Sequence, residues 1–368
     1  MYDHIREDIF FFMFYASVAM LSLIACCYLL FRRANAIAPN VTPPVRLRRW
    51  TAAFFAAIAL CHLWYLPMYF LTSPDDMMLG SLIAGLLDSM TIIPLAIVIL
   101  FVMLQDRRRP LWPVVVMVAP LIAGLVWCII TRNDALLPVL FVYFLLMWLG
   151  LITYMVREIR QYGRWLRDNY ADLEHKEVWQ GFVVLAIILL AYAIYSLDVG
   201  ELIYEYILEG INIVLVCYLL WRVETLSDLS LSLSPFIQEE ADAKGDTEDN
   251  ALSQTIRDNI GSKLKRYCEE PQLYLQHDIS LPQLAQTIGT NRLYLSQHFS
   301  SQGMTYNAYI NGLRIQHFIN LYHETVATRQ PISVRQMAHQ SGFRSYSTFN
   351  AAFKQNMGMT ATEWKRNI

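Results

Sequence analysis

The apolar stretches within the first 222 residues contain several ionisable residues, among them His62, Asp88, Glu205 and Glu209. Ionisable side chains inside hydrocarbon cost about a few kcal/mol and usually bind or relay something charged. We therefore interpret these residues as a candidate pocket for a cation, a proton or a small cationic ligand. The alternative is an acidic helix end that reaches outside water, with His62 hydrogen-bonded between helices.

Seven apolar stretches would position these residues, and each is close to the ~20 residues that cross a bilayer. They cover residues 9–31, 50–71, 79–104, 111–131, 136–156, 179–197 and 201–221. At ~1.5 Å per residue, His62 and Glu209 both lie roughly 18 Å from the cytoplasmic ends of their helices. Asp88 and Glu205 lie nearer the outer surface. The four residues are therefore expected to share one outward-facing pocket.

The distribution of basic residues predicts the orientation of these spans. Lys and Arg accumulate on cytoplasmic loops. The segments that follow the first, third, fifth and seventh stretches carry fourteen Lys/Arg, whereas the opposite side carries only Arg6 and Arg132. We therefore expect an outside N-terminus, a cytoplasmic C-terminus and a multi-pass protein of the bacterial inner membrane, with membrane lipids as partners.

Two segments on the cytoplasmic side leave alternatives open. Residues 157–178 are polar with scattered aromatic side chains, and they either extend the fifth helix or lie at the membrane surface. Leu219, Val223, Leu226 and Leu233 stand near heptad spacing. This spacing is compatible with a short continuation of the last span that would form a homodimer.

Composition divides the chain into three parts, predicted as 1–222, 223–255 and 256–368. The whole chain is 55% hydrophobic and 16% charged, which indicates that its first part lies outside water. Residues 223–255 include an acidic run with few apolar side chains, so we expect a flexible tether. Residues 256–368 carry twelve Lys/Arg and six Asp/Glu, a balance of +6. Such a basic soluble end suggests a polyanionic partner.

The C-terminal part contains two similar repeats, residues 279–289 and 332–342, at a constant offset of 53 residues. In each repeat a short amphipathic pattern places an Ala at the expected helix-packing interface and ends at Gly289 or Gly342. Glycine adopts the left-handed backbone that a tight turn needs, and Ala permits close helix crossing. This layout is typical of a helix-turn-helix motif.

A second helix is predicted after each turn, over residues 291–301 and 345–355. Thr290 or Asn291 would cap the first of these helices and Ser345 the second. The inward faces of these helices carry Leu295 and Phe299 after the first repeat, and Phe349 and Phe353 after the second. A long amphipathic helix over residues 306–322 would fix the separation of the two helix-turn-helix motifs. The predicted fold is therefore all-α: a seven-helix transmembrane bundle and a double helix-turn-helix domain.

Residues 256–368 resemble the AraC/XylS family of transcription regulators. The matching residues are Ala285, Gly289, Tyr294, Leu295, Ser296, Phe299, Tyr309, Arg314, Ala338, Gly342, Phe343, Tyr346, Phe349, Phe353, Lys354, Gly358, Thr360, Glu363 and Trp364. The resemblance implies that the second helix of each helix-turn-helix motif enters a major groove of double-stranded DNA. Ala351 departs from the family, because many relatives have a base-contacting polar residue there.

Base-contacting positions carry over from this resemblance. They are Arg292, Leu293, Ser296 and Gln297 in the first motif, and Tyr346, Ser347 and Asn350 in the second motif. Gln297 and Asn350 can pair bidentately with adenine, and Arg292 can serve guanine or phosphate. Arg344, Lys354 and Arg314 resemble phosphate anchors or structural ion-pair residues instead.

The resulting hypothesis is a one-component regulator in which the membrane part senses a signal or only anchors the DNA-binding domain. The alternative is a transporter or membrane receptor with an appended DNA-binding module, which the acids in the apolar stretches support. We expect no enzymatic activity, because no zinc-protease, nucleophile-elbow or phosphate-loop motif occurs. The six cysteines lack the spacing of a metal site, and we expect neither a metal nor a cofactor.

Overall fold

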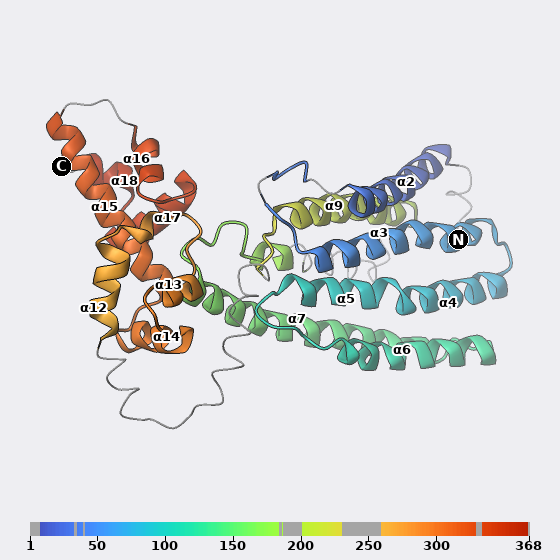
Figure 1. Ribbon diagram of the computed structural model, residues 1–368. Helices are drawn as coiled ribbons and strands as arrows, with labels where there is room; N and C mark the ends of the chain where they lie inside the picture. The colour runs from blue at the N-terminus through green and yellow to red at the C-terminus, as the bar shows by residue number, and fades with distance from the viewer. Residues whose placement is uncertain are drawn as a thin grey trace, which may run out of the picture. The chain divides into compact units, whose positions relative to one another are not determined.

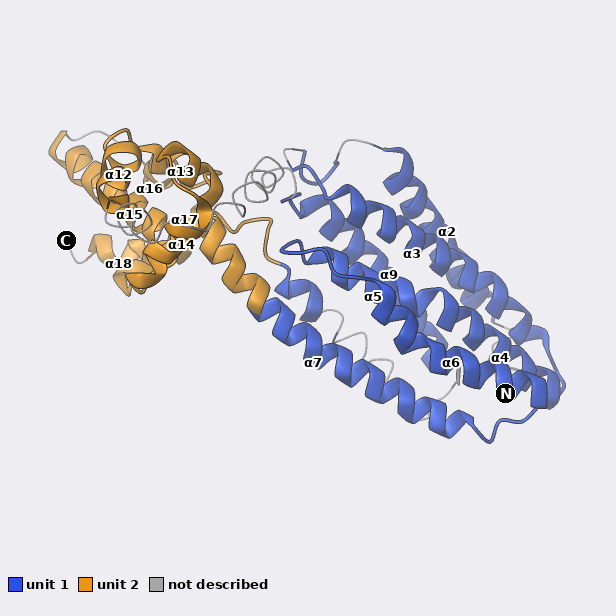
Figure 2. Cartoon of the chain, turned by 60° about the horizontal axis from the view of Figure 1, so that its bottom comes forward, with its two compact units in different colours: residues 1–160, 178–230 blue, residues 161–177, 231–368 orange. Residues whose placement is uncertain are grey.

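The computed structural model describes residues 8–32, 35–39, 41–183, 186, 201–229, 259–328 and 333–366 (Figure 1). The named elements within these ranges are all helices, and one isolated β-bridge pairs Tyr170 with Ser280. The predicted all-α class is therefore confirmed. The chain divides into two compact units (Figure 2). Unit 1 comprises residues 1–160 and 178–230, and unit 2 comprises residues 161–177 and 231–368.

Unit 1 is a bundle of long apolar helices. In chain order these are α2 (Ile9–Phe31), α3 (Val45–Tyr65) with the 3-10 turn η1 (Leu66–Phe70), α4 (Pro74–Met90), α5 (Ile92–Met103), α6 (Trp112–Thr131), α7 (Leu137–Asn169) and α9 (Glu201–Thr225). Six helical stretches among the described residues are long and apolar enough to cross a membrane, with α3–η1 and α4–α5 each counting as one. Most of the predicted span 179–197 lies outside the described residues, so the number seven stays a prediction.

The third predicted span contains a break that the sequence pattern did not predict. The backbone of Thr91 has φ −123° and ψ −70°, which separates α4 from α5. Pro94 follows three residues later and has no N–H to donate to the carbonyl of Met90. The break therefore falls where proline removes a helical hydrogen bond.

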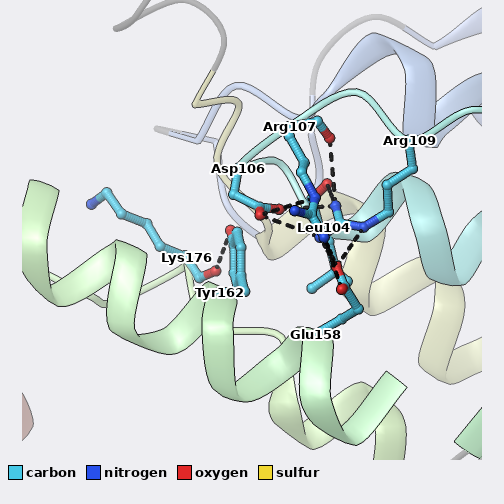
Figure 3. A network of polar contacts seen from close by, with 7 residues as sticks. All are labelled: Leu104, Asp106, Arg107, Arg109, Glu158, Tyr162 and Lys176. Atoms are coloured by element: carbon cyan, nitrogen blue, oxygen red, sulfur yellow. Dashed lines mark hydrogen bonds and ion pairs between the residues drawn. The ribbon is translucent and has the colours of Figure 1, made fainter. Parts of the chain in front are cut away.

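The helix of the fifth predicted span extends well beyond its apolar part. Helix α7 continues to Asn169, so of the two alternatives for the polar segment, extension of the fifth helix is observed as far as that residue. Glu158 on this extension is buried and binds two arginines that follow α5 (Figure 3). The distance from Glu158 Oε2 is 2.6 Å to Arg109 Nη2 and 2.8 Å to Arg107 Nη2. Removing one partner of such a buried ion pair costs about 3–5 kcal/mol, so this cluster fixes the part of α7 that belongs to unit 1.

Unit 2 contains the two helix-turn-helix motifs. Its elements are α12 (Ile260–Leu264), the π-helical turn η3 (Lys265–Glu269), the 3-10 turn η4 (Leu273–Leu275), α13 (Leu281–Thr287), α14 (Arg292–Ser301), α15 (Tyr306–Thr328), α16 (Val334–Gln340), α17 (Tyr346–Met357) and α18 (Ala361–Arg366). Each motif has its own apolar core, and α15 contributes to both. Ile310 near its start packs in the first core, and Phe318 packs in the second.

The two cores are closed by the residues that the repeat singled out. Ala285 and Leu295 are buried in the first core, and Ala338 and Phe349 are buried in the second. Cys268 also lies in the first core, where burial raises the pKa of its thiol to about 12. This cysteine therefore stays protonated and packs as a small apolar side chain.

Candidate nucleic-acid interface

Both predicted turns adopt the backbone that requires glycine. The φ angle is +66° at Gly289, after α13, and +87° at Gly342, after α16. These positive angles are readily available only to glycine, and each turn directs the chain from the first helix of its motif into the second. The repeated Ala-x-x-x-Gly pattern therefore predicted the turns correctly.

The second helix of each motif, here called the recognition helix, begins at a side-chain cap. Asn291 Oδ1 accepts the N–H of Tyr294 at 2.8 Å and caps α14. Ser345 Oγ accepts the N–H of Thr348 at 3.2 Å and caps α17. Asn291, and not Thr290, is thus the first cap. A buried apolar face that includes Phe299 holds α14, and one that includes Phe353 holds α17, so the opposite faces stay accessible.

The predicted base-contacting residues differ in accessibility, and Tyr346 packs partly against the second core. Leu293 is 58% exposed. The side chains of Gln297, Ser347 and Lys354 are exposed, whereas those of Arg292, Ser296, Tyr346 and Asn350 are half-buried. Arg344 is exposed and pairs with Asp278, at 2.7 Å between Nη2 and Oδ2. DNA contact by these residues stays a prediction.

Arg314 has a structural position and is not accessible to phosphate. Its side chain is 1% exposed. Its Nε donates to the carbonyl of Tyr274 at 2.8 Å, and its Nη2 donates to the carbonyl of Gln276 at 2.6 Å. Of the two roles that the sequence left open for Arg314, the structural role is therefore the one observed.

Unit 2 also contains contacts that sequence reasoning missed. Arg292 Nε donates to Asn169 Oδ1 at 2.9 Å. Thr348 in the first turn of α17 donates its hydroxyl to Glu174 Oε2 at 3.0 Å. Asn169 and Glu174 stand more than a hundred residues before their partners, and no local pattern marks them as neighbours.

A second candidate site lies inside unit 1, where the structure brings His62 and Glu209 together. His62 Nε2 lies 3.1 Å from Glu209 Oε2, and both side chains are almost fully buried. The carbonyl of His62 accepts the hydroxyl of Tyr15 at 2.7 Å, and the two rings pack at 4.5 Å between centroids. The structure therefore brings His62 and Glu209 into contact, while the outward-facing pocket and its ligand stay predictions.

The other two acids of the predicted pocket are held by aromatic hydrogen-bond donors. Glu205 accepts the hydroxyl of Tyr69 at 3.0 Å. Asp88 accepts the hydroxyl of Tyr65 at 2.7 Å and the indole N–H of Trp64 at 3.2 Å. Sequence reasoning did not identify these aromatic partners. Within the described part of the chain, no group of three or more His, Cys, Asp or Glu residues could hold a metal ion.

Comparison with known proteins identifies the C-terminal part. Residues 284–367 match a helix-turn-helix domain family. Over 75 residues the chain is 35% identical to the TCP pilus virulence regulatory protein of Vibrio cholerae serotype O1, in both its classical Ogawa and its El Tor Inaba strains. The match covers 20% of this chain and 25% of these relatives. No solved structure matches the chain significantly. The C-terminal part is thus a helix-turn-helix domain of the AraC type, as the sequence predicts.

Proposed function

We propose that this protein is a membrane-embedded one-component transcription regulator and has no enzymatic activity. The observation that carries the proposal is a double helix-turn-helix domain of AraC type on the same chain as six helical stretches, among the described residues, that are able to cross a membrane. The domain would bind double-stranded DNA by placing its two recognition helices in successive major grooves. The spans would hold it beside the inner membrane of a bacterium.

The outer faces of unit 1 support membrane embedding. Phe10 on α2 is 78% exposed and Ile130 on α6 is 75% exposed, and large apolar side chains are exposed on the other spans as well. In water these faces would cost about 25 cal/mol for each Å² of apolar surface, whereas lipid removes that cost. The basic residues of the loops favour a cytoplasmic position for the domain.

The buried pair His62–Glu209 supports a sensing role for unit 1. The pair places a carboxylate against an imidazole, the side chain that most often senses protons and cations in proteins. A proton, a cation or a small cationic ligand would therefore be the signal, with α9 changing its position when the pair changes charge. Replacing Glu209 by Gln removes the charge and keeps the shape. We expect loss of signal-dependent transcription, and an unchanged response would remove the sensing role.

The proposal as a whole is tested by mapping the DNA that the full chain binds in cells. The test variant is Ser347→Ala with Asn350→Ala, because both substitutions lie on the polar face of α17. The matched control is Gln355→Ala, an exposed position near the other end of the same helix. We expect the test variant to lose the bound sites and the control to keep them. Identical maps for all three chains would contradict DNA reading by α17.

A further inference from the structure

The segment after the fifth span packs into the DNA-binding domain itself. We call residues 168–177 the arm. Ala171 of the arm is 1% exposed and lies in the core of the first motif. Asn307 on α15 donates to the carbonyl of Ala171 at 2.7 Å and to that of Tyr170 at 3.2 Å. The middle of the arm is therefore anchored on the helix that joins the two motifs.

From this anchor the arm reaches both recognition helices. On one side, Asn169 accepts the Nε–H of Arg292, the first residue of α14. On the other side, Glu174 accepts the hydroxyl of Thr348 in the first turn of α17. One short segment thus contacts the N-terminal turns of both helices that would read DNA.

The arm contacts the ends of the recognition helices that the proposed DNA binding would use. The N-terminal residues of a recognition helix contact base edges and phosphates. The Nε–H of Arg292 cannot donate to Asn169 and to a DNA acceptor with full strength in each bond. Residues 168–177 contain four Asp/Glu and one Lys, a balance of −3 with His neutral. Phosphates that approach these helices would also be repelled by the carboxylate of Glu174.

We propose that the arm is an internal competitor of DNA, docked on both recognition helices through Asn169 and Glu174. This inference rests on the proposed DNA binding. When DNA binds, the two end contacts open while Ala171 stays in the core as a pivot. Transcription control would then act on the opening of the arm.

The connections of the arm suit such control. Its start is the end of α7, the helix whose Glu158 binds Arg107 and Arg109. One helical turn after Glu158, the hydroxyl of Tyr162 donates to the carbonyl of Lys176 at 3.1 Å, which fixes the far end of the arm to α7 (Figure 3). A rotation or shift of α7 would therefore move the arm.

The first test measures DNA affinity of the full chain in lipid nanodiscs at low salt. The probe is a fluorescent mixed-sequence duplex that presents two successive major grooves. Glu174→Ala removes one end contact and a repelling charge, so we expect about two- to tenfold tighter binding. The matched control is Glu324→Ala, which removes an exposed carboxylate from α15 and changes little. Unchanged or weaker binding by Glu174→Ala would overturn the competition.

The second test uses hydrogen exchange of the unmodified chain, so it does not depend on how a variant folds. We expect the amides of residues 172–177 to exchange faster when the duplex is added. A purely structural arm would instead show unchanged or slower exchange, and that result would overturn the proposal. If neither the unmodified chain nor Glu174→Ala binds the duplex, the proposed DNA binding itself fails, and the inference fails with it.

Discussion

Arg314 shows how one side chain can join two structural motifs. It stands on α15 between the two apolar cores, is buried, and donates to backbone carbonyls that precede the first motif. Its guanidinium also lies 5.7 Å from the ring centroid of Phe343, directly after the turn of the second motif. The position of Arg314 in the sequence gave no means to choose between structural pairing and a phosphate contact. Burial decides this question, because a side chain that is 1% exposed cannot reach DNA.

We expect Arg314→Met to destabilise unit 2 by about 2–4 kcal/mol, because the carbonyls of Tyr274 and Gln276 would stay buried without their donor. The measurement is the free energy of opening from native-state hydrogen exchange of α15 amides in the full chain. The control is Arg335→Met, at an exposed position on α16. A change below about 0.5 kcal/mol for Arg314→Met would show that the contacts are dispensable.

Two exposed side chains on the recognition helices should differ in what they contribute to DNA binding. Gln297 can read a base, so Gln297→Ala should cost about 1–3 kcal/mol on a specific site and little on other DNA. Lys354 is predicted to anchor a phosphate, so Lys354→Ala should weaken binding to every sequence and reduce the salt slope by about 1. Titrations of both variants over several salt concentrations check this. Equal losses on specific and mixed DNA for Gln297→Ala would exclude base reading.

At the scale of elements, the helix-turn-helix repeat was well predicted because its signals are local. A cap lies next to its helix, and a turn glycine lies directly after the helix that it ends. The break at Thr91 was missed, although Pro94 was visible, because proline is also tolerated within helices: Pro120 lies inside α6 without dividing it. Whether a proline divides a helix depends on how the surrounding helices pack, and no local pattern records that packing.

The two turn glycines should respond differently to the same substitution. At Gly342 an added Cβ would lie 2.9 Å from the Cα and the carbonyl oxygen of Leu275, in addition to the left-handed backbone. At Gly289 the space around an added Cβ is open, so only the backbone strain remains. We expect Gly342→Ala to cost about 3 kcal/mol or more and Gly289→Ala about 1 kcal/mol. Hydrogen exchange of α16 and α13 amides measures both, and equal costs would contradict the steric difference.

At the scale of the whole molecule, composition and charge indicate an apolar part and a basic helix-turn-helix part, but not the contacts of distant segments. Apolar length predicts the spans, and the depth estimate predicts a shared pocket for His62 and Glu209, whose side chains lie 3.1 Å apart. The arm shows the limit of this reasoning. The polar pattern of residues 161–177 indicates an extension of the fifth predicted span, yet these residues belong to the same compact unit as the DNA-binding domain. Such an assignment depends on long-range packing of Ala171 and Asn307, which periodicity and composition do not encode.

The proposed regulatory role requires that the chain crosses the membrane with its helix-turn-helix domain in the cytoplasm. A labelling experiment can measure this orientation. Ala135 lies exposed between α6 and α7, on the side predicted to face outward, and Arg108 lies exposed between α5 and α6, on the predicted cytoplasmic side. In intact cells an impermeant maleimide should label Ala135→Cys and should label Arg108→Cys only after permeabilisation. The unsubstituted chain reports the background from its own cysteines. The reverse pattern would place the helix-turn-helix domain outside the cell, because the loops alternate in side along the bundle, and a domain outside could not meet the chromosome.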